Sequence, residues 1–234
     1  MAVVVRAMRN TMQHILAAVL LGTLFLAACT TTPTACEGAT DRGSCIVELA
    51  VEQHDDALCD TLEGNTQTWC LTDVAAAADN PAICDRITST ESREFCKRDI
   101  YIAREDVEAC QTLTTGAKND CLNDIAHATN DWLTCVSMEE GARREECIDG
   151  ISRSENDPYG CLRLNKQNPR RDGCIYMTSV RSNTPATCSE LQDSQLENLC
   201  FTTIATNAQT TDDCNELPER YKTFCMKQFA DQNQ

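Results

Sequence analysis

Apolar residues recur along the chain at fixed distances from its cysteines. Counting from Cys36, every other cysteine is followed three residues later by an apolar side chain, which is the i, i+3 spacing of a short helix. These side chains belong to Ala39, Leu62, Ile87, Leu113, Met138, Leu164, Leu191 and Leu217. The intervening cysteines open a longer stripe, with mostly apolar residues one and four positions later and mostly small residues five positions later. Each segment therefore predicts a short helix followed by a longer one that packs closely on its neighbours.

The start of each short helix carries a predicted cap. Four residues before its cysteine stands a side chain whose oxygen can accept a hydrogen bond from a helix N-terminus. These capping residues are Thr32, Asp55, Asn80, Asp106, Asp131, Asp157, Thr184 and Thr210. Between the two cysteines, Gly64, Gly116 and Gly141 predict left-handed residues at the end of the first helix. Each unit then consists of a short helix, a turn and a longer helix.

The spacing of sixteen cysteines shows that this unit is an internal repeat. A fixed separation of 14 residues alternates with a variable one of 9 to 13, which gives eight repeats. Stacked repeats bury their apolar stripes against one another, so we expect an all-α fold, a disulfide-stapled α-solenoid of eight helical hairpins.

Hairpin geometry favours a disulfide within each repeat, because the turn lies about midway between its two cysteines. Pairing between successive repeats would leave a mismatch of about six residues, or ~9 Å along a helix. The predicted pairs are Cys36 with Cys45, Cys59 with Cys70, Cys84 with Cys96, Cys110 with Cys121, Cys135 with Cys147, Cys161 with Cys174, Cys188 with Cys200 and Cys214 with Cys225.

The seventeenth cysteine, Cys29, follows a different kind of segment. Arg6 and Arg9 precede an unbroken weakly polar run, residues 15–28, which is typical of a signal peptide and too short to span a bilayer. Leu26-Ala27-Ala28-Cys29 resembles the lipobox of bacterial lipoproteins. The resemblance implies a signal peptide over residues 1–28, lipid on Cys29, a short tether over 29–31 and the repeats over 32–234. The alternative is ordinary secretory cleavage that leaves Cys29 as a thiol.

Three further resemblances follow from these motifs. Thr30 rather than Asp after the lipobox cysteine implies, by likeness to Gram-negative lipoproteins, a place in the outer membrane. The stapled hairpins are similar in concept to cysteine-rich Sel1-like repeats, which belong with tetratricopeptide-type solenoids. The pattern Asp-x3-Cys-x2-Leu, a loop, then Cys-x3-Ile-Ala also resembles Cys-rich helical repeats of prokaryotic surface proteins. The two resemblances of the repeats cover residues 32–234 and imply a fold without an activity.

Composition excludes several functional classes. The 36 acidic residues against 20 basic ones argue against a nucleic-acid partner. No C-x-x-C motif is present, so redox and zinc motifs lack their spacing, and no metal or cofactor is expected. His54 and His127 occupy different positions of different repeats, and we interpret both as solvated helix residues. We therefore expect a protein that is not an enzyme.

One region departs from the acidic background. The sixth repeat and the turn of the fifth carry seven cations, whereas Asp172 is the single acid from Cys161 to Thr187. The cations are Arg143, Arg144, Arg163, Lys166, Arg170, Arg171 and Arg181. One interpretation is ordinary surface variation; the other is a basic patch that docks an acidic partner or a polyanionic envelope polymer. Trp69 and Trp132 are interpreted as packing residues.

Two functions follow as expectations. The first is a non-catalytic envelope lipoprotein, held to the membrane through Cys29, that serves as a scaffold for another envelope protein. The second is a lipoprotein that binds a small ligand, an ion or a charged envelope polymer. An envelope hydrolase is a distant third, because no catalytic motif supports it.

Overall fold

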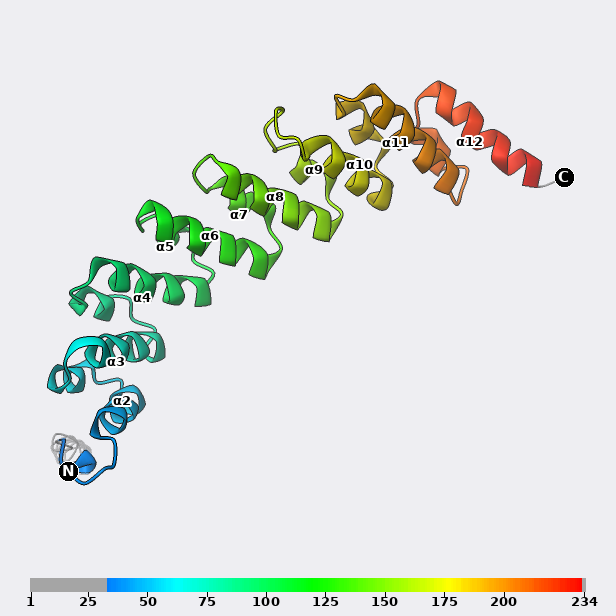
Figure 1. The fold of residues 1–234 in the computed structure, drawn as a ribbon. Helices are drawn as coiled ribbons and strands as arrows, with labels where there is room; N and C mark the ends of the chain where they lie inside the picture. Colours follow the sequence, from blue (N-terminus) through cyan, green and yellow to red (C-terminus); the bar gives the residue numbers. More distant parts are fainter. Residues whose placement is uncertain (1–32, 233–234) are drawn as a thin grey trace, which may run out of the picture. The chain divides into compact units, whose positions relative to one another are not determined.

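The computed structural model describes residues 33–232, which form helices joined by turns, with no strand in that range (Figure 1). The all-α, solenoid-like fold predicted from the repeats is confirmed. The chain divides into two compact units, one ending at Ile87 and the other beginning at Thr88. The predicted signal peptide, Cys29, the tether and Thr32 lie outside the described residues.

The first unit holds two long helices with short helical turns beside them. Helix α2 packs against α3, and η2 contacts both. Their bounds are η1 (Pro33–Cys36), α2 (Arg42–Gln53), η2 (Asp56–Thr61), α3 (Gly64–Ala77) and η3 (Ile83–Arg86).

The second unit is a one-dimensional stack of long helices. Helices α4, α6, α8, α10, α11 and α12 each contact the next in that order and lie side by side (Figure 1). The bounds are α4 (Thr90–Ala103), α5 (Val107–Cys110), α6 (Thr115–Thr129), α7 (Trp132–Val136), α8 (Ala142–Glu155), α9 (Pro158–Cys161), α10 (Arg171–Ser182), η4 (Pro185–Glu190), α11 (Ser194–Asn207), η5 (Asp213–Glu216) and α12 (Glu219–Gln232).

The first helix of each repeat is shorter than the pattern predicts. It spans one or two turns, and five of these segments in residues 33–232 are 3-10 rather than α. The apolar residue three positions after the cysteine does not continue the helix. Its N–H donates to the cysteine carbonyl, as Leu164 does to Cys161 at 3.2 Å, and closes the last turn. From Ile87 onward this side chain is buried in every repeat, so the predicted apolar position is correct.

The disulfides follow the predicted hairpin pairing. The bonded pairs are Cys36–Cys45, Cys59–Cys70, Cys110–Cys121, Cys135–Cys147, Cys161–Cys174, Cys188–Cys200 and Cys214–Cys225. Cys84 and Cys96 are also disulfide-bonded. Most of these cysteines are fully buried beside the apolar stripe. A hairpin loop of this length contributes about 3 kcal/mol by chain entropy, so the staples offset the small core of each repeat.

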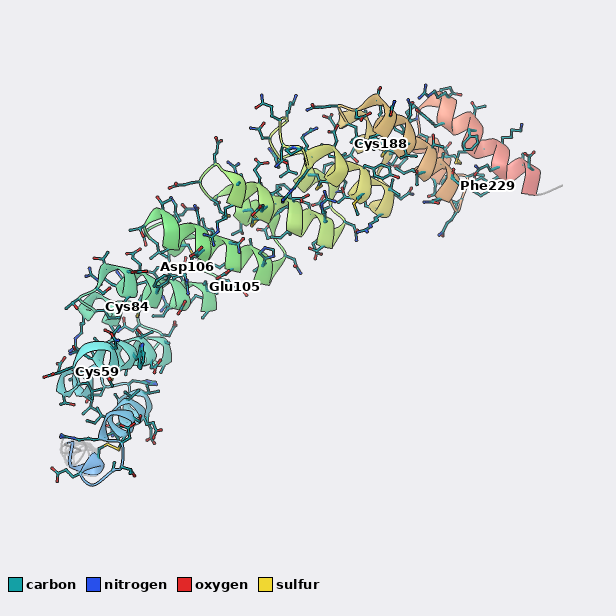
Figure 2. All side chains as sticks on the ribbon, in the orientation of Figure 1. Cys59, Cys84, Glu105, Asp106, Cys188 and Phe229 are labelled. Atoms are coloured by element: carbon teal, nitrogen blue, oxygen red, sulfur yellow. A yellow bond between two sulfur atoms is a disulfide. The ribbon has the colours of Figure 1, made fainter. Side chains whose placement is uncertain are left out.

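The turn between repeats has a recurring left-handed residue that the pattern did not predict. Six such residues directly precede a capping position: His54, Asp79, Glu105, Asn130, Asn156 and Asn183. The next residue donates its N–H to a carbonyl five residues back, as Asp106 does to Tyr101 at 2.9 Å. Figure 2 labels Glu105 and Asp106 at one of these turns. A left-handed residue followed by this hydrogen bond is a helix C-terminal motif, and the cap of the next short helix follows it directly.

The prediction of left-handed glycines is confirmed only for Gly64, whereas Gly141, at φ +157°, is close to extended backbone. Gly116 lies inside α6 without a positive φ, and Gly64, at φ +59°, begins α3 rather than ending a short helix. The left-handed residues that end helices stand instead after the long ones. Short polar side chains such as Asn tolerate that conformation, so three asparagines were the available signal.

Most predicted caps are confirmed. The carboxylates of Asp55, Asp106, Asp131 and Asp157 each accept a hydrogen bond from a backbone N–H of the following helix. Asn80 accepts from Ala82 at 3.2 Å and Thr210 from Asp213 at 3.4 Å. Thr184 makes no such bond, because its hydroxyl instead contacts Ser182.

Candidate interaction site

Neighbouring repeats of the second unit are joined by a side chain that stands two residues before the second cysteine. This side chain accepts a hydrogen bond from the backbone N–H that follows the buried apolar residue of the next repeat. We call this contact the clasp. The bonds run from Thr114 to Glu94 at 2.8 Å, from Glu139 to Asn119 at 3.2 Å, from Asn165 to Glu145 at 3.1 Å and from Gln192 to Asp172 at 3.1 Å.

The junction between the seventh and eighth repeats lacks this bond. Asn198 occupies the clasp position, but the next repeat presents Pro218, which has no N–H to donate. The amide oxygen of Asn198 instead accepts from the Tyr221 hydroxyl at 2.6 Å. The Tyr221 ring also stacks on Phe201, with 4.9 Å between centroids. An aromatic contact thus replaces the backbone bond at this junction.

The residue one position earlier than the clasp is basic in most repeats, and at two of these positions it contacts the next repeat. Lys118 Nζ lies 3.0 Å from Glu139. Arg171 is only 3% exposed, and its Nη1 donates to the Glu190 carbonyl at 3.0 Å. Two of the seven predicted patch residues, Arg144 and Arg171, occupy this position of their repeats. Arg171 therefore has a structural contact and no free surface.

A cavity of about 550 Å³ lies where the turns of the fifth and sixth repeats meet. We call it the turn cavity. Its walls come from the start of α8 and from the loop that leads into α10. Charged residues of both signs line it: Glu140, Arg144, Glu145, Glu146, Arg163 and Arg170. Asn165, Gln167 and Asn168 add amide groups. A drug-sized ligand or a few residues of a peptide fit a space of this size.

The acids of the turn cavity are occupied by neighbours. Glu145 accepts from the Asn165 N–H and from Asn168 Nδ2, the latter at 2.7 Å. Glu140 pairs with Arg144 at 3.5 Å, and Glu146 with Arg170 at 3.7 Å. The three glutamates and three arginines of the lining balance in formal charge, and the two that form no ion pair with each other or with a neighbour among the described residues are Glu145 and Arg163.

The structure brings together some of the seven predicted cations and separates others. Arg144, Arg163 and Arg170 line the turn cavity. Lys166 is exposed on the same loop, whereas Arg143 pairs with Asp120 across the preceding junction. Arg181 is exposed in the last turn of α10, ten residues beyond Arg171 and about 15 Å from it. Arg181 thus does not belong to this cluster.

Trp132 is held firmly between the fifth and sixth repeats. Its Nε1 donates to the Asp157 carboxylate at 2.7 Å. Gly160 provides the room for the ring, because a Cβ at this residue would lie 3.0 Å from the indole and 2.0 Å from Ser152 Oγ. The Arg163 guanidinium lies over the ring, 6.0 Å from a centroid. The packing role predicted for Trp132 is confirmed.

The same prediction is wrong for Trp69, which is 64% exposed. It stands directly before a second cysteine, on the outer side of α3. The apolar stripe begins after that cysteine, so the position before it faces away from the core.

His54 and His127, the two histidines within the described residues, stand apart. His54 caps the end of α2 in a left-handed conformation, and His127 lies in the last turn of α6. No group of three potential metal ligands occurs within residues 33–232. No helix in the described part of the chain is long and apolar enough to cross a membrane.

Two exposed carboxylates at repeat junctions are held in their ionised form. A hydrogen bond from Lys118, and then one from Thr115, lower the pKa of Glu139. Backbone N–H groups of Thr210 and Gln209 lower the pKa of Asp213. Each carboxylate therefore favours the folded state more strongly above its ordinary pKa than below it.

The cysteine chemistry locates the protein in an oxidising, extracytoplasmic environment, because disulfides in this number do not persist where thiols are kept reduced. No protein-family model, no curated protein and no solved structure matches the chain.

Proposed function

We propose that the protein is a non-catalytic interaction module of the bacterial cell envelope, tethered to the membrane through lipid on Cys29. The observation that carries this proposal is the turn cavity. It combines three arginines, three glutamates and amide groups in one hollow, and it lies on a stack of disulfide-linked hairpins. Repeat arrays of this kind use such surfaces to bind other proteins.

The anchor is a separate part of the proposal. The lipobox-like run ending at Cys29 supports acylation, and the repeats begin within a few residues of it. Thr30 supports the outer membrane as the destination. Cys29→Ser should move the protein from the membrane fraction to the soluble periplasmic or secreted fraction. Retention of the variant in the membrane fraction would contradict a lipid anchor.

The test of binding uses Arg170→Glu, since Arg170 lines the turn cavity and is more than half exposed. Arg171 is left intact because it is buried between repeats. Arg181→Glu is the matched control, with the same charge change in the last turn of α10, away from the cavity, whereas Arg170 directly precedes that helix. Affinity capture from the native envelope should give a partner whose yield falls at least fivefold for Arg170→Glu and stays unchanged for Arg181→Glu. Equal yields would contradict a role for the cavity.

A second candidate function is supported by the size and charge of the same cavity. Arg163, which forms no ion pair among the described residues, lies beside the amide groups and suits a small anionic ligand or a stretch of anionic envelope polymer. Thermal melting with short polyphosphate and with polyglutamate, each against a neutral polymer, tests this idea. A ligand-dependent rise in melting temperature that Arg170→Glu abolishes would favour it over a protein partner.

A further inference from the structure

The short helices of the fifth and sixth repeats expose large apolar side chains where other repeats of the second unit do not. Leu133 is 57% exposed and Tyr159 is 54% exposed, each two residues before the first cysteine of its repeat. The same position holds Glu108, Ala186 and Asp212 in the fourth, seventh and eighth repeats. On the short helices of the second unit, large exposed apolar residues thus occur only in the two repeats that form the turn cavity, whereas Phe95, Leu199 and Phe224 are exposed on long helices elsewhere.

Trp132 joins these two residues into one surface. It precedes Leu133, and its indole contacts α9 beside Tyr159 through the Asp157 bond and the Gly160 backbone. Arg163 lies over the indole and also lines the turn cavity. We call Trp132, Leu133, Tyr159 and Arg163 the aromatic face. It is continuous with the cavity through Arg163.

The aromatic face has the composition of an energetically important interface centre. Trp, Tyr and Arg are the residues most enriched among those whose truncation weakens binding. The indole is fixed in place before any partner arrives, so little side-chain entropy is lost when a partner binds. A solvated surface has no requirement for two half-exposed large apolar residues beside a locked tryptophan.

Charge identifies the kind of partner. Neither Arg163 nor Lys166 has a carboxylate within ion-pair distance among the described residues. Arg163 lies over the Trp132 ring, and Lys166 is exposed three residues further along the chain of the same repeat. A partner that covers this surface gains most when it carries carboxylates beside an apolar side chain.

We infer that the aromatic face binds an acidic segment of another polypeptide, with an apolar side chain seated against Trp132, Leu133 and Tyr159 and carboxylates against Arg163 and Lys166. This inference rests on the proposed interaction function and names its partner class. The turn cavity then receives polar groups at the edge of the same segment.

The test places a photo-crosslinking amino acid at Leu133 or Tyr159 of the full chain in the cells that produce it. Glu108 and Ala186 are the matched controls, because both are exposed at the equivalent position of neighbouring repeats. Mass spectrometry identifies the crosslinked peptide. We expect the same segment from Leu133 and Tyr159, with more acidic than basic residues, at a yield at least fivefold above both controls. Arg163→Glu should lower that yield at least fivefold without changing the melting temperature.

Several results would overturn the inference. These are a neutral or basic segment, a second copy of this chain, a lipid or polymer adduct, or yields no higher than at Glu108 and Ala186. A partner crosslinked only through probes elsewhere, for example at Trp69, would refute the aromatic face and leave the interaction function standing. The absence of any crosslinked polypeptide from all five positions would refute both.

Discussion

The junction between the fifth and sixth repeats differs sharply from that between the seventh and eighth, although the same 14-residue spacing separates their cysteines. In the first junction Glu145 accepts hydrogen bonds from the next turn, and Trp132 bonds to Asp157. In the second, Pro218 removes the backbone donor, and a Phe201–Tyr221 stack takes over. The cysteines thus define the hairpins, while other residues define how hairpins join and what they expose.

Among substitutions at these two junctions, Gly160→Ala should reduce stability the most. The new Cβ would lie 2.0 Å from Ser152 Oγ and 3.0 Å from Trp132, so the fifth and sixth repeats must separate. We expect a loss of about 3 kcal/mol in the free energy of unfolding, measured by urea denaturation without reductant. Gly150→Ala is the control, since its nearest neighbour is 3.8 Å away. It should raise stability by about 0.5 to 1 kcal/mol. Equal behaviour of the two variants would contradict the close contact.

Removal of a clasp should have the next largest effect. Glu145→Ala leaves the Asn165 N–H and the Asn168 amide without their acceptor, and we expect a loss of about 1.5 kcal/mol. Amide hydrogen exchange at Asn165 should accelerate more than that of residues in α11. Asn198→Ala, at the same position of the seventh repeat, should cost about 0.5 kcal/mol because no backbone donor depends on it. A larger loss from Asn198→Ala would reverse the proposed difference between the junctions.

A smaller effect is expected from Trp132→Phe. The substitution keeps an aromatic ring in the site but removes the donor to Asp157, so we expect a loss of about 1 kcal/mol in thermal or urea unfolding. Trp69→Phe should change stability by less than about 0.5 kcal/mol, because the Trp69 side chain is exposed and does not hold neighbouring repeats together. A neutral Trp132→Phe would show that the Asp157 bond does not hold the indole.

The smallest effect concerns pH. Because hydrogen bonds lower the pKa of Glu139 in the folded state, its contribution to stability is complete above the ordinary pKa and disappears as pH falls through the folded-state pKa. The stability difference between the parent and Glu139→Gln should therefore shrink as pH falls from 7 to 3. The corresponding difference for Asn198→Ala should stay constant, since an amide does not titrate. A difference for Glu139→Gln that does not change with pH would contradict the assignment.

Much of the fold could be read from spacing. Cysteine separations predicted the hairpins and their disulfides, and the Asp residues four positions before Cys59, Cys110, Cys135 and Cys161 predicted helix starts, because capping and helix periodicity are local. The left-handed turn residues are not predictable from residue type alone, because half of them are His, Asp or Glu, which have a weaker preference for that conformation than Gly or Asn. The clasp position also carried a signal, in Glu94, Asn119, Glu145, Asp172 and Asn198.

The candidate site was only partly predictable. The cations of the sixth repeat were visible in the sequence, but charge counts do not distinguish a buried Arg171 from an exposed Arg170. Solvation of each guanidinium depends on which neighbour it meets across the junction. Likewise, the cysteine spacing does not show whether the Tyr159 side chain is exposed or buried. The exposure of a short helix is set by the repeat that packs on it.

The sequence by itself determined the repeat, the helical hairpin, the disulfide pairing and most helix caps, since each depends on residues within a few turns of one another. Only the tertiary structure decided which cations line the turn cavity, which carboxylates clasp the next repeat, and that Trp132, Leu133, Tyr159 and Arg163 share one surface. These are contacts between residues 20 or more positions apart, as in the Trp132–Asp157 and Asn165–Glu145 bonds. Such contacts form only after the hairpins have stacked, and their geometry is absent from any local pattern.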